Sequence, residues 1–317
     1  MKTKVFDSTL AYFINQLDNL DKTLHEPLYS VSWGRDIKLR TGITMANEST
    51  SFIRAAVASI GSNAAAGKPW ISPNTTTLPG VSINGERVVL PLRLLGREIS
   101  YTSVELERSQ LLGQPVDQAK FAALNIGYQM DTDEMVYIGD AGTGSLGLVN
   151  SDLVGVAGVT ADGTGSSPLW STKTADQILR DVNDMIQTAW ANSGFAVCPD
   201  KLLLPPAKFA YIVSQKVSSA GNVSILKFLQ DNSISLNVNG RPLDIQPVKW
   251  LVNRGVGGAI DRMVCYTNQE DRVRFPMVPV RRESPYYLGI KFNAPYIWAF
   301  GEVEIVYPDT ILYRDGI

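Results

Sequence analysis

The stretch Leu111–Asn150 reads LLGQPVDQAKFAALNIGYQMDTDEMVYIGDAGTGSLGLVN and places a glycine-rich segment directly after a helical pattern. Pro115 stands where a helix can begin, because the first helical residue needs no backbone N–H. Apolar residues then recur at intervals of three and four, which predicts one long helix from Pro115 to about Tyr137. The expected buried stripe of this helix consists of Val116, Ala119, Ala123, Ile126 and Met130, widened by Phe121, Leu124 and Tyr128.

Three glycines after this helix, Gly142, Gly144 and Gly147, have the G-x-G-x-x-G spacing of a dinucleotide-binding loop. Such a loop needs a strand before the glycines and a helix that opens on the third one, where the phosphates bind. Here a helix precedes the glycines, and Leu148–Thr160 shows no amphipathic helical pattern. We therefore interpret the glycines as a turn after the long helix, with positive φ angles or a tight approach of the backbone.

Residue types that support catalysis or metal binding are sparse. His25 is the only histidine, and Cys198 and Cys265 are far apart in the sequence. These residues do not make a metal site, and no serine stands in a G-x-S-x-G elbow. The sequence predicts no catalytic residue, no metal and no cofactor, and hence a protein that is not an enzyme.

An acidic cluster near the end of the long helix consists of Asp131, Asp133 and Glu134. Paired carboxylates can do acid–base chemistry or bind a hard cation. Helical spacing puts Asp131 and Glu134 on one face and Asp133 on another. We interpret the cluster as a solvated helix face.

The bulk composition is that of a globular protein, with 317 residues, 44% hydrophobic and 19% charged. A net charge of −2 lacks the basic excess of proteins that grip nucleic acid. The N-terminus has no signal-peptide core, and no apolar run is long enough to span a bilayer. Two separated cysteines are typical of a reducing compartment, so we expect a soluble cytoplasmic protein.

The first hundred residues contain no compact-domain pattern. Residues 1–50 predict an arm with a short amphipathic helix at Ser8–Leu20. Residues 51–100 contain a Pro/Gly-rich tip followed by strand-like segments at Arg87–Leu95 and Glu98–Thr102, which predicts a long protruding hairpin. A loop of this length is expected to pack on something outside its own subunit.

Residues 151–262 predict a compact mixed α/β unit. Thr174 and Gln177 have capping-box spacing at the start of a helix, and Gly194 stands where its C-terminal cap belongs. The expected buried stripe of this helix is Ile178, Val182, Ile186 and Ala189. Further helices are expected at Pro206–Gln215 and Asn222–Asn232, and strands at Asp200–Pro206, Leu243–Leu251 and Asp261–Thr267.

The last segment, residues 278–317, is rich in aromatic residues and predicts paired strands whose aromatic side chains pack a sheet face. Glu302 and Glu304 alternate with Val303 and Ile305, which predicts a strand that is buried on one face only.

This order of segments resembles that of a tailed-bacteriophage major capsid protein of the Hong Kong ninety-seven type, whose fold is shared with encapsulins. REISYTSVELERSQLLGQPVDQAKFAALNIGYQMDTDEMVYIGD (Arg97–Asp140) is similar to the family's strand and spine helix. GSLGLVN (Gly144–Asn150) is similar to its Gly-Leu-x-Asn turn. The resemblance implies an α+β fold with an N-terminal arm, an extended β-hairpin loop, a peripheral domain and a mixed α/β axial domain. It assigns 1–50 to the arm, 51–100 to the extended loop, 101–150 with 263–317 to the peripheral domain, and 151–262 to the axial domain.

The same resemblance implies a major capsid protein that self-assembles, as hexamers and pentamers, into an icosahedral head shell around the DNA genome. It implies assembly in the bacterial host cytoplasm, a virion location, and a portal and a decoration protein as partners. Relatives with a built-in scaffold carry a longer N-terminal segment, so we expect a separate scaffolding protein. Contact with packaged DNA is expected to be non-specific, and no membrane is involved. The expected subunit contacts are Lys68, Pro69, Trp70, Arg87, Arg281 and Arg282.

Three alternatives stay open. An encapsulin-like compartment has the same fold but encloses an enzyme cargo. A nucleotide-dependent enzyme would use Gly142–Gly147. Another virion protein, such as a tail protein, would form tubes or rings in place of closed shells.

Overall fold

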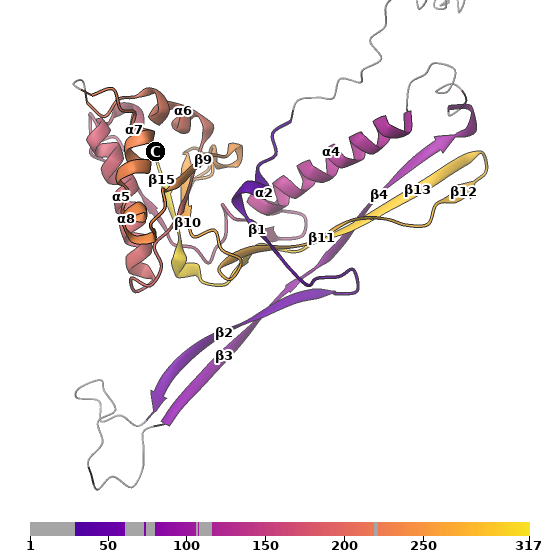
Figure 1. Ribbon diagram of the computed structural model, residues 1–317, viewed down its shortest axis with the longest axis horizontal. Coiled ribbons are helices and arrows are strands. Elements are labelled where there is room, and N and C mark those ends of the chain that lie inside the picture. The colour runs from indigo at the N-terminus through magenta and orange to yellow at the C-terminus, as the bar shows by residue number, and fades with distance from the viewer. Residues whose placement is uncertain (1–28, 61–72, 74–79, 106, 108–115, 219–220) are drawn as a thin grey trace, which may run out of the picture. The chain divides into compact units, whose positions relative to one another are not determined.

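The computed structural model describes residues 29–60, 73, 80–105, 107, 116–218 and 221–317 (Figure 1). The expected arm helix at Ser8–Leu20, His25 and the contact residues Lys68, Pro69 and Trp70 lie outside the described residues. The chain divides into two compact units. Unit 1 comprises Met1–Val31, Gly96–Met130 and Arg281–Ile297, and unit 2 comprises Ser32–Leu95, Asp131–Val280 and Trp298–Ile317.

Unit 2 is built around a five-stranded sheet with the order β7-β15-β10-β8-β9. The strands are β7 (Val156–Gly158), β8 (Lys201–Leu204), β9 (Asp244–Pro247), β10 (Arg262–Tyr266) and β15 (Ile311–Asp315). Strand β10 is antiparallel to β15 and β8, whereas β7 and β9 are parallel to their neighbours. Every residue of β8 and β10 is buried, which is expected of central strands covered on both faces.

Four helices pack against this sheet (Figure 1). They are α5 (Ala175–Asn192), α6 (Pro206–Ser214), α7 (Ile225–Asn232) and α8 (Ile234–Asn239). Thr174 and Gln177 form the predicted capping box at the start of α5, and Gly194 follows the helix with a φ of 65°. The predicted stripe on α5 is confirmed, because Ile178, Val182, Ile186 and Ala189 are all buried in the core.

The predicted strand at Leu243–Leu251 is shorter than expected. It stops at Pro247, and Lys249–Leu251 forms a 3-10 turn, η2. Further 3-10 turns are η1 (Trp170–Thr172) and η3 (Pro308–Thr310).

A second set of strands in unit 2 surrounds β11 (Val273–Arg282). Strand β1 (Lys38–Arg40), which follows the short helix α2 (Trp33–Asp36), pairs with β11 in parallel. Strand β14 (Glu304–Ile305) pairs with β11 antiparallel.

A long two-stranded hairpin of β2 (Ser49–Ile60) and β3 (Gly80–Pro91) also belongs to unit 2 (Figure 1). The register is continuous, from Ser49 opposite Pro91 to Ile60 opposite Gly80. A protruding hairpin is present as predicted, but the predicted strand bounds are wrong, because β2 was not predicted and Glu98–Thr102 lies in β4 (Arg93–Thr102), outside the hairpin.

Unit 1 contains β12 (Tyr286–Leu288), paired antiparallel with β13 (Lys291–Phe300). Strand β4 (Arg93–Thr102) also pairs with β13. The connection between β12 and β13 turns at Gly289, whose φ is 64°. Aromatic contacts support the unit, with ring centroids 5.1 Å apart for Tyr287 and Phe292.

Helix α4 (Val116–Tyr137) has the predicted C-terminal end, and its predicted buried stripe is confirmed for two residues and wrong for three. Phe121, Ala123 and Met130 are exposed, whereas Leu124 and Tyr128 are buried. Apolar residues occur on all sides of this helix, so their period does not single out the packed face.

Candidate functional site

One face of the β2–β3 hairpin is apolar and exposed. The register places Ile53 opposite Arg87, and side chains on one face recur at every second residue. Ile53, Ile83 and Val89 therefore share a face, which we call the apolar face. Ile53 and Ile83 are each 68% exposed and Val89 is 51% exposed. Exposed isoleucines on a two-stranded ribbon need a partner, because such a ribbon is marginally stable alone.

The opposite face of the hairpin is turned toward its own unit. Arg54 donates hydrogen bonds to the carbonyl oxygens of Ile305 (2.9 Å) and Val306 (3.3 Å). Its guanidinium carbon also lies 5.5 Å from the centre of the Phe52 ring. The chain thus satisfies one face of the hairpin by itself and leaves the apolar face uncovered.

A second apolar surface lies at the turn between β12 and β13 in unit 1. Tyr287 is 77% exposed, Leu288 66% and Ile290 71%. These residues form what we call the apolar tip. The expectation that the C-terminal aromatic residues pack a sheet face holds for Trp298, Phe300 and Tyr313, which are buried, but is wrong for Tyr287. Three large exposed side chains at one turn indicate a surface that another molecule covers.

The glycine-rich segment forms a small hairpin of β5 (Gly139–Asp140) and β6 (Ser145–Leu146). Gly144 has a φ of 72°, and the Gly142 N–H donates to Asp140 Oδ1 at 2.9 Å. Gly147 passes directly against the backbone of Tyr137 and Ile138. No helix opens on Gly147, so the geometry of a dinucleotide loop is absent from this described segment.

The side chain of Asn150 holds this turn against the end of α4. Its Oδ1 accepts from the Gly147 N–H at 2.8 Å, and its Nδ2 donates to the Ile138 carbonyl at 2.8 Å. The Gly-Leu-x-Asn pattern therefore has a structural cause, because the Asn150 side chain links the turn to the end of α4 by two hydrogen bonds.

Gly147→Ala is expected to destabilise the protein. The new methyl group would overlap the Tyr137 carbonyl and the Ile138 nitrogen, and these backbone atoms cannot rotate away. We expect a loss of about 1–3 kcal/mol or more in the free energy of unfolding. Urea unfolding measures it, with Gly158→Ala as the matched control, because the nearest atom to a methyl group there is 3.9 Å away. Equal stability of the two variants would contradict this account of the turn.

The interpretation of the acidic cluster as a solvated face is wrong for Asp133. This carboxylate is fully buried and accepts from the backbone N–H groups of Ser32 (2.8 Å) and Trp33 (3.1 Å). Its other oxygen accepts from Trp250 Nε1 at 2.7 Å. Asp133 thus fixes the segment before β1 to the end of α4, whereas Glu134 is exposed.

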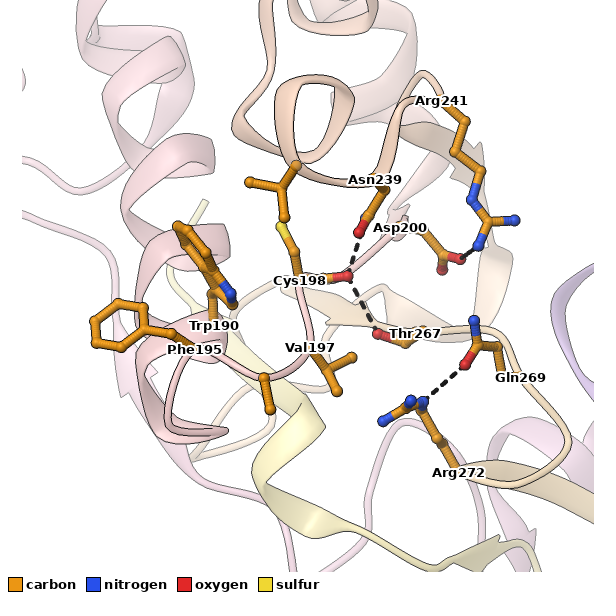
Figure 2. A pocket seen from close by; sticks show the side chains of 12 residues that line it. Trp190, Phe195, Val197, Cys198, Asp200, Asn239, Arg241, Thr267, Gln269 and Arg272 are labelled. Carbon is orange, nitrogen blue, oxygen red and sulfur yellow. Dashed lines mark hydrogen bonds and ion pairs between the residues drawn. The ribbon is translucent and has the colours of Figure 1, made fainter.

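A recess of about 260 Å³ lies between the end of α5 and the loops that follow α8 and β10 (Figure 2). The Trp190 and Phe195 rings meet edge to face at its rim, with centroids 5.2 Å apart. Arg241 lies 3.3 Å from Asp200, and Asn239 donates to the Cys198 carbonyl at 3.0 Å (Figure 2). The lining contains Cys198 and Asp200, but burial raises the pKa of the Cys198 thiol and so disfavours the thiolate that would act as a nucleophile. Among the described residues, no group of three or more His, Cys, Asp or Glu side chains could hold a metal ion.

The two cysteines are expected to resist thiol reagents in the native protein. Burial raises the pKa of Cys198 to about 11, with a smaller contribution from Asp200, and raises the pKa of Cys265 well above its usual value. Thiols react as thiolates, so the native protein should label slowly at pH 8 and titrate both cysteines after unfolding. A disulfide-exchange assay measures this, and rapid native labelling of Cys198 would contradict its burial.

The comparison with known protein families decides the identity of the chain. The profile of the family described as "Major capsid protein" matches residues 67–317, which is most of the sequence. The chain belongs to the major capsid protein family. This capsid protein is therefore a component of a virion shell. No curated protein matches its sequence.

Solved capsid structures share the fold of this capsid protein at low sequence identity. The capsid of Myoviridae phage XM1 is 17% identical with a TM-score of 0.74, over 96% of this chain and 98% of that one. The capsid of the native GTA particle is 10% identical with a TM-score of 0.64, over 98% and 99%. The virus-like particle from Pyrococcus furiosus is 12% identical with a TM-score of 0.51, over 88% and 90%. The α+β capsid fold predicted from the order of segments is thereby confirmed.

The predicted contact residues of the capsid protein that the structure describes are all exposed. Arg87 lies on the apolar face, where its Nη2 donates to Ser51 Oγ at 3.2 Å. Arg281 pairs with Glu283 at 2.8 Å, and Arg282 follows it in unit 1. Their role as subunit contacts stays a prediction. Ile53, Ile83 and the apolar tip were not singled out by the sequence, because alternation alone does not tell which face of a hairpin its own subunit covers. Among the described residues, no helix is long and apolar enough to cross a membrane.

Proposed function

We propose that this capsid protein assembles through hexamers and pentamers into an icosahedral head shell that encloses double-stranded DNA. The observation that carries the proposal is the pair of uncovered apolar surfaces, the apolar face in unit 2 and the apolar tip in unit 1. A subunit with two separate exposed apolar surfaces can contact more than one neighbouring subunit at once. Modest contact energies then give strong cooperative closure, because each later contact is made at high effective concentration.

We assign the segments of the chain to the parts of the capsid fold in their order along the sequence. Residues 1–50 serve as the arm and 51–100 as the extended loop that reaches a neighbouring subunit. Residues 101–150 with 263–317 form the peripheral domain, which includes α4. Residues 151–262 form most of the axial domain, and β10 and β15 join it from the C-terminal segment, because they lie in the same five-stranded sheet.

The proposed partners are other virion components and the packaged DNA. A net charge of −2 is consistent with a shell that encloses DNA without binding it tightly. A separate scaffolding protein, a portal and a decoration protein would act with the shell, which would assemble in the bacterial host cytoplasm. The protein would do this without catalysing a reaction.

A protein compartment of the encapsulin type is the second candidate, favoured by the likeness to the virus-like particle from Pyrococcus furiosus. Particles isolated from the native source separate the two. A phage head should contain nuclease-protected double-stranded DNA, whereas a compartment should contain a protein cargo and no long DNA. Sedimentation velocity of the purified protein tests assembly itself, and a stable monomer with its scaffolding partner supplied would contradict both candidates.

A further inference from the structure

Glu304 is a buried carboxylate in the capsid protein, although its sequence pattern predicts a solvent-facing position. It is 0% exposed and lies between two arginines. Arg274 Nε is 2.6 Å from one carboxylate oxygen, and Arg40 Nη1 contacts the other. These arginines come from β11 and β1, so three strands that are distant in sequence meet at one charge. The carboxylate is needed there, because two partly buried guanidinium groups without it would repel each other.

The same cluster is joined to the base of the β2–β3 hairpin. Arg40, while bound to Glu304, donates from Nη2 to the Ser51 carbonyl of β2 at 3.0 Å. Arg54, further along β2, donates to the carbonyls of Ile305 and Val306, the residues that directly follow Glu304. The hairpin is therefore tied at two points to the short strand that carries Glu304.

Apolar packing holds the second strand of the hairpin, β3, at the hairpin base. Leu92, just after β3, is buried with Val278 and Ala299, and Ile43 and Met45 pack against them. The Leu92 N–H donates to the Glu48 carbonyl at 2.9 Å. Both strands are thus held where they leave the unit. The Leu92 contact is apolar and contains no charge. A substitution that neutralises Glu304 therefore weakens only the charged attachment of the hairpin.

We propose that Glu304 is a positioning residue that fixes the direction in which the β2–β3 hairpin leaves its own subunit. The hairpin carries the apolar face, so its direction decides where that face meets a second copy of the chain. The inference rests on the proposed function in that a misdirected hairpin would close shells of the wrong size, or none. Glu304 is buried within its own subunit and acts on the hairpin through Arg40.

Glu304→Gln tests the proposal, with Glu48→Gln as the matched control. The control makes the same chemical change at an exposed position at the hairpin base. Spin labels on cysteines introduced at Asn84, on the hairpin, and Asp309, on the body of unit 2, report the hairpin direction. The native cysteines are buried, so we expect the label to react with the two introduced cysteines far faster. Labelled protein diluted into unlabelled protein gives the intramolecular distance distribution whether or not the subunits assemble.

We expect Glu304→Gln to widen that distribution about twofold, as a released hinge does, and to change the size or yield of particles. Glu48→Gln should match the parent protein in both measurements. If Glu304→Gln does not fold, Arg40→Ala breaks the link to Ser51 while leaving the Glu304–Arg274 pair and should give the same two changes. An unchanged distribution in a folded variant would overturn the proposal. A parent protein that never assembles would instead refute the proposed function, and the distance distribution would still decide the role of Glu304.

Discussion

Replacing Ile53 and Ile83 together by glutamate is expected to abolish shell assembly while the subunit stays folded. Both side chains are 68% exposed in the single chain, so the change removes little packing within it. The register puts residue 53 opposite Arg87, where a glutamate meets an opposite charge across the hairpin. Covering each isoleucine at a contact contributes about 1.5–3 kcal/mol, which the variant loses at every copy of the contact in the shell.

Electron microscopy and sizing chromatography measure this effect, with circular dichroism to check the fold. Ile53→Val with Ile83→Val is the matched control, because it keeps the face apolar and suits a strand. The control should assemble like the parent protein. Normal particles from the glutamate variant would show that the apolar face is not a subunit contact.

Asp315→Ala is expected to cost about 3–5 kcal/mol of stability, because it leaves a buried guanidinium without its partner. Arg262 is 6% exposed and bonds both carboxylate oxygens of Asp315, at 2.7 Å and 2.9 Å. The same guanidinium donates to the Val149 carbonyl at 2.9 Å and lies 4.7 Å from the Tyr313 ring centre. It therefore connects β10 and β15 to the segment after the glycine turn.

Urea unfolding of the parent and variant proteins measures this loss. Asp231→Ala removes one partner of the exposed Lys227–Asp231 pair on α7 and should cost less than about 1 kcal/mol. Replacing both partners, Arg262→Met with Asp315→Leu, should recover much of the loss, because no buried charge is left unpaired. Equal costs for Asp315→Ala and Asp231→Ala would contradict the assignment.

The sequence predicts those features whose signals are local. The capping box at Thr174 and the apolar stripe that follows it lie within a few residues of each other, and α5 forms as predicted. The Pro/Gly-rich segment likewise predicts a hairpin, though not the bounds of its strands, and the glycines predict the C-terminal end of α4. These features need no knowledge of distant contacts.

The residues that the sequence misplaced are buried charges with distant partners. Asp133 caps backbone groups about a hundred positions away, and Glu304 pairs with Arg40 across most of the chain. Neither carboxylate differs in local pattern from a solvated one. The predicted stripe of α4 was too wide for a related reason, because apolar residues surround the helix and only the tertiary structure selects Leu124 and Tyr128 over Phe121 and Met130.

Electron microscopy of the purified protein, alone and with its scaffolding partner, tests the central claim most directly. The account predicts closed shells of uniform size, or rings of five and six subunits, with the β2–β3 hairpin of each subunit lying on its neighbour. Monomers or small dimers under both conditions would contradict it, as would shells whose hairpins touch only their own subunit.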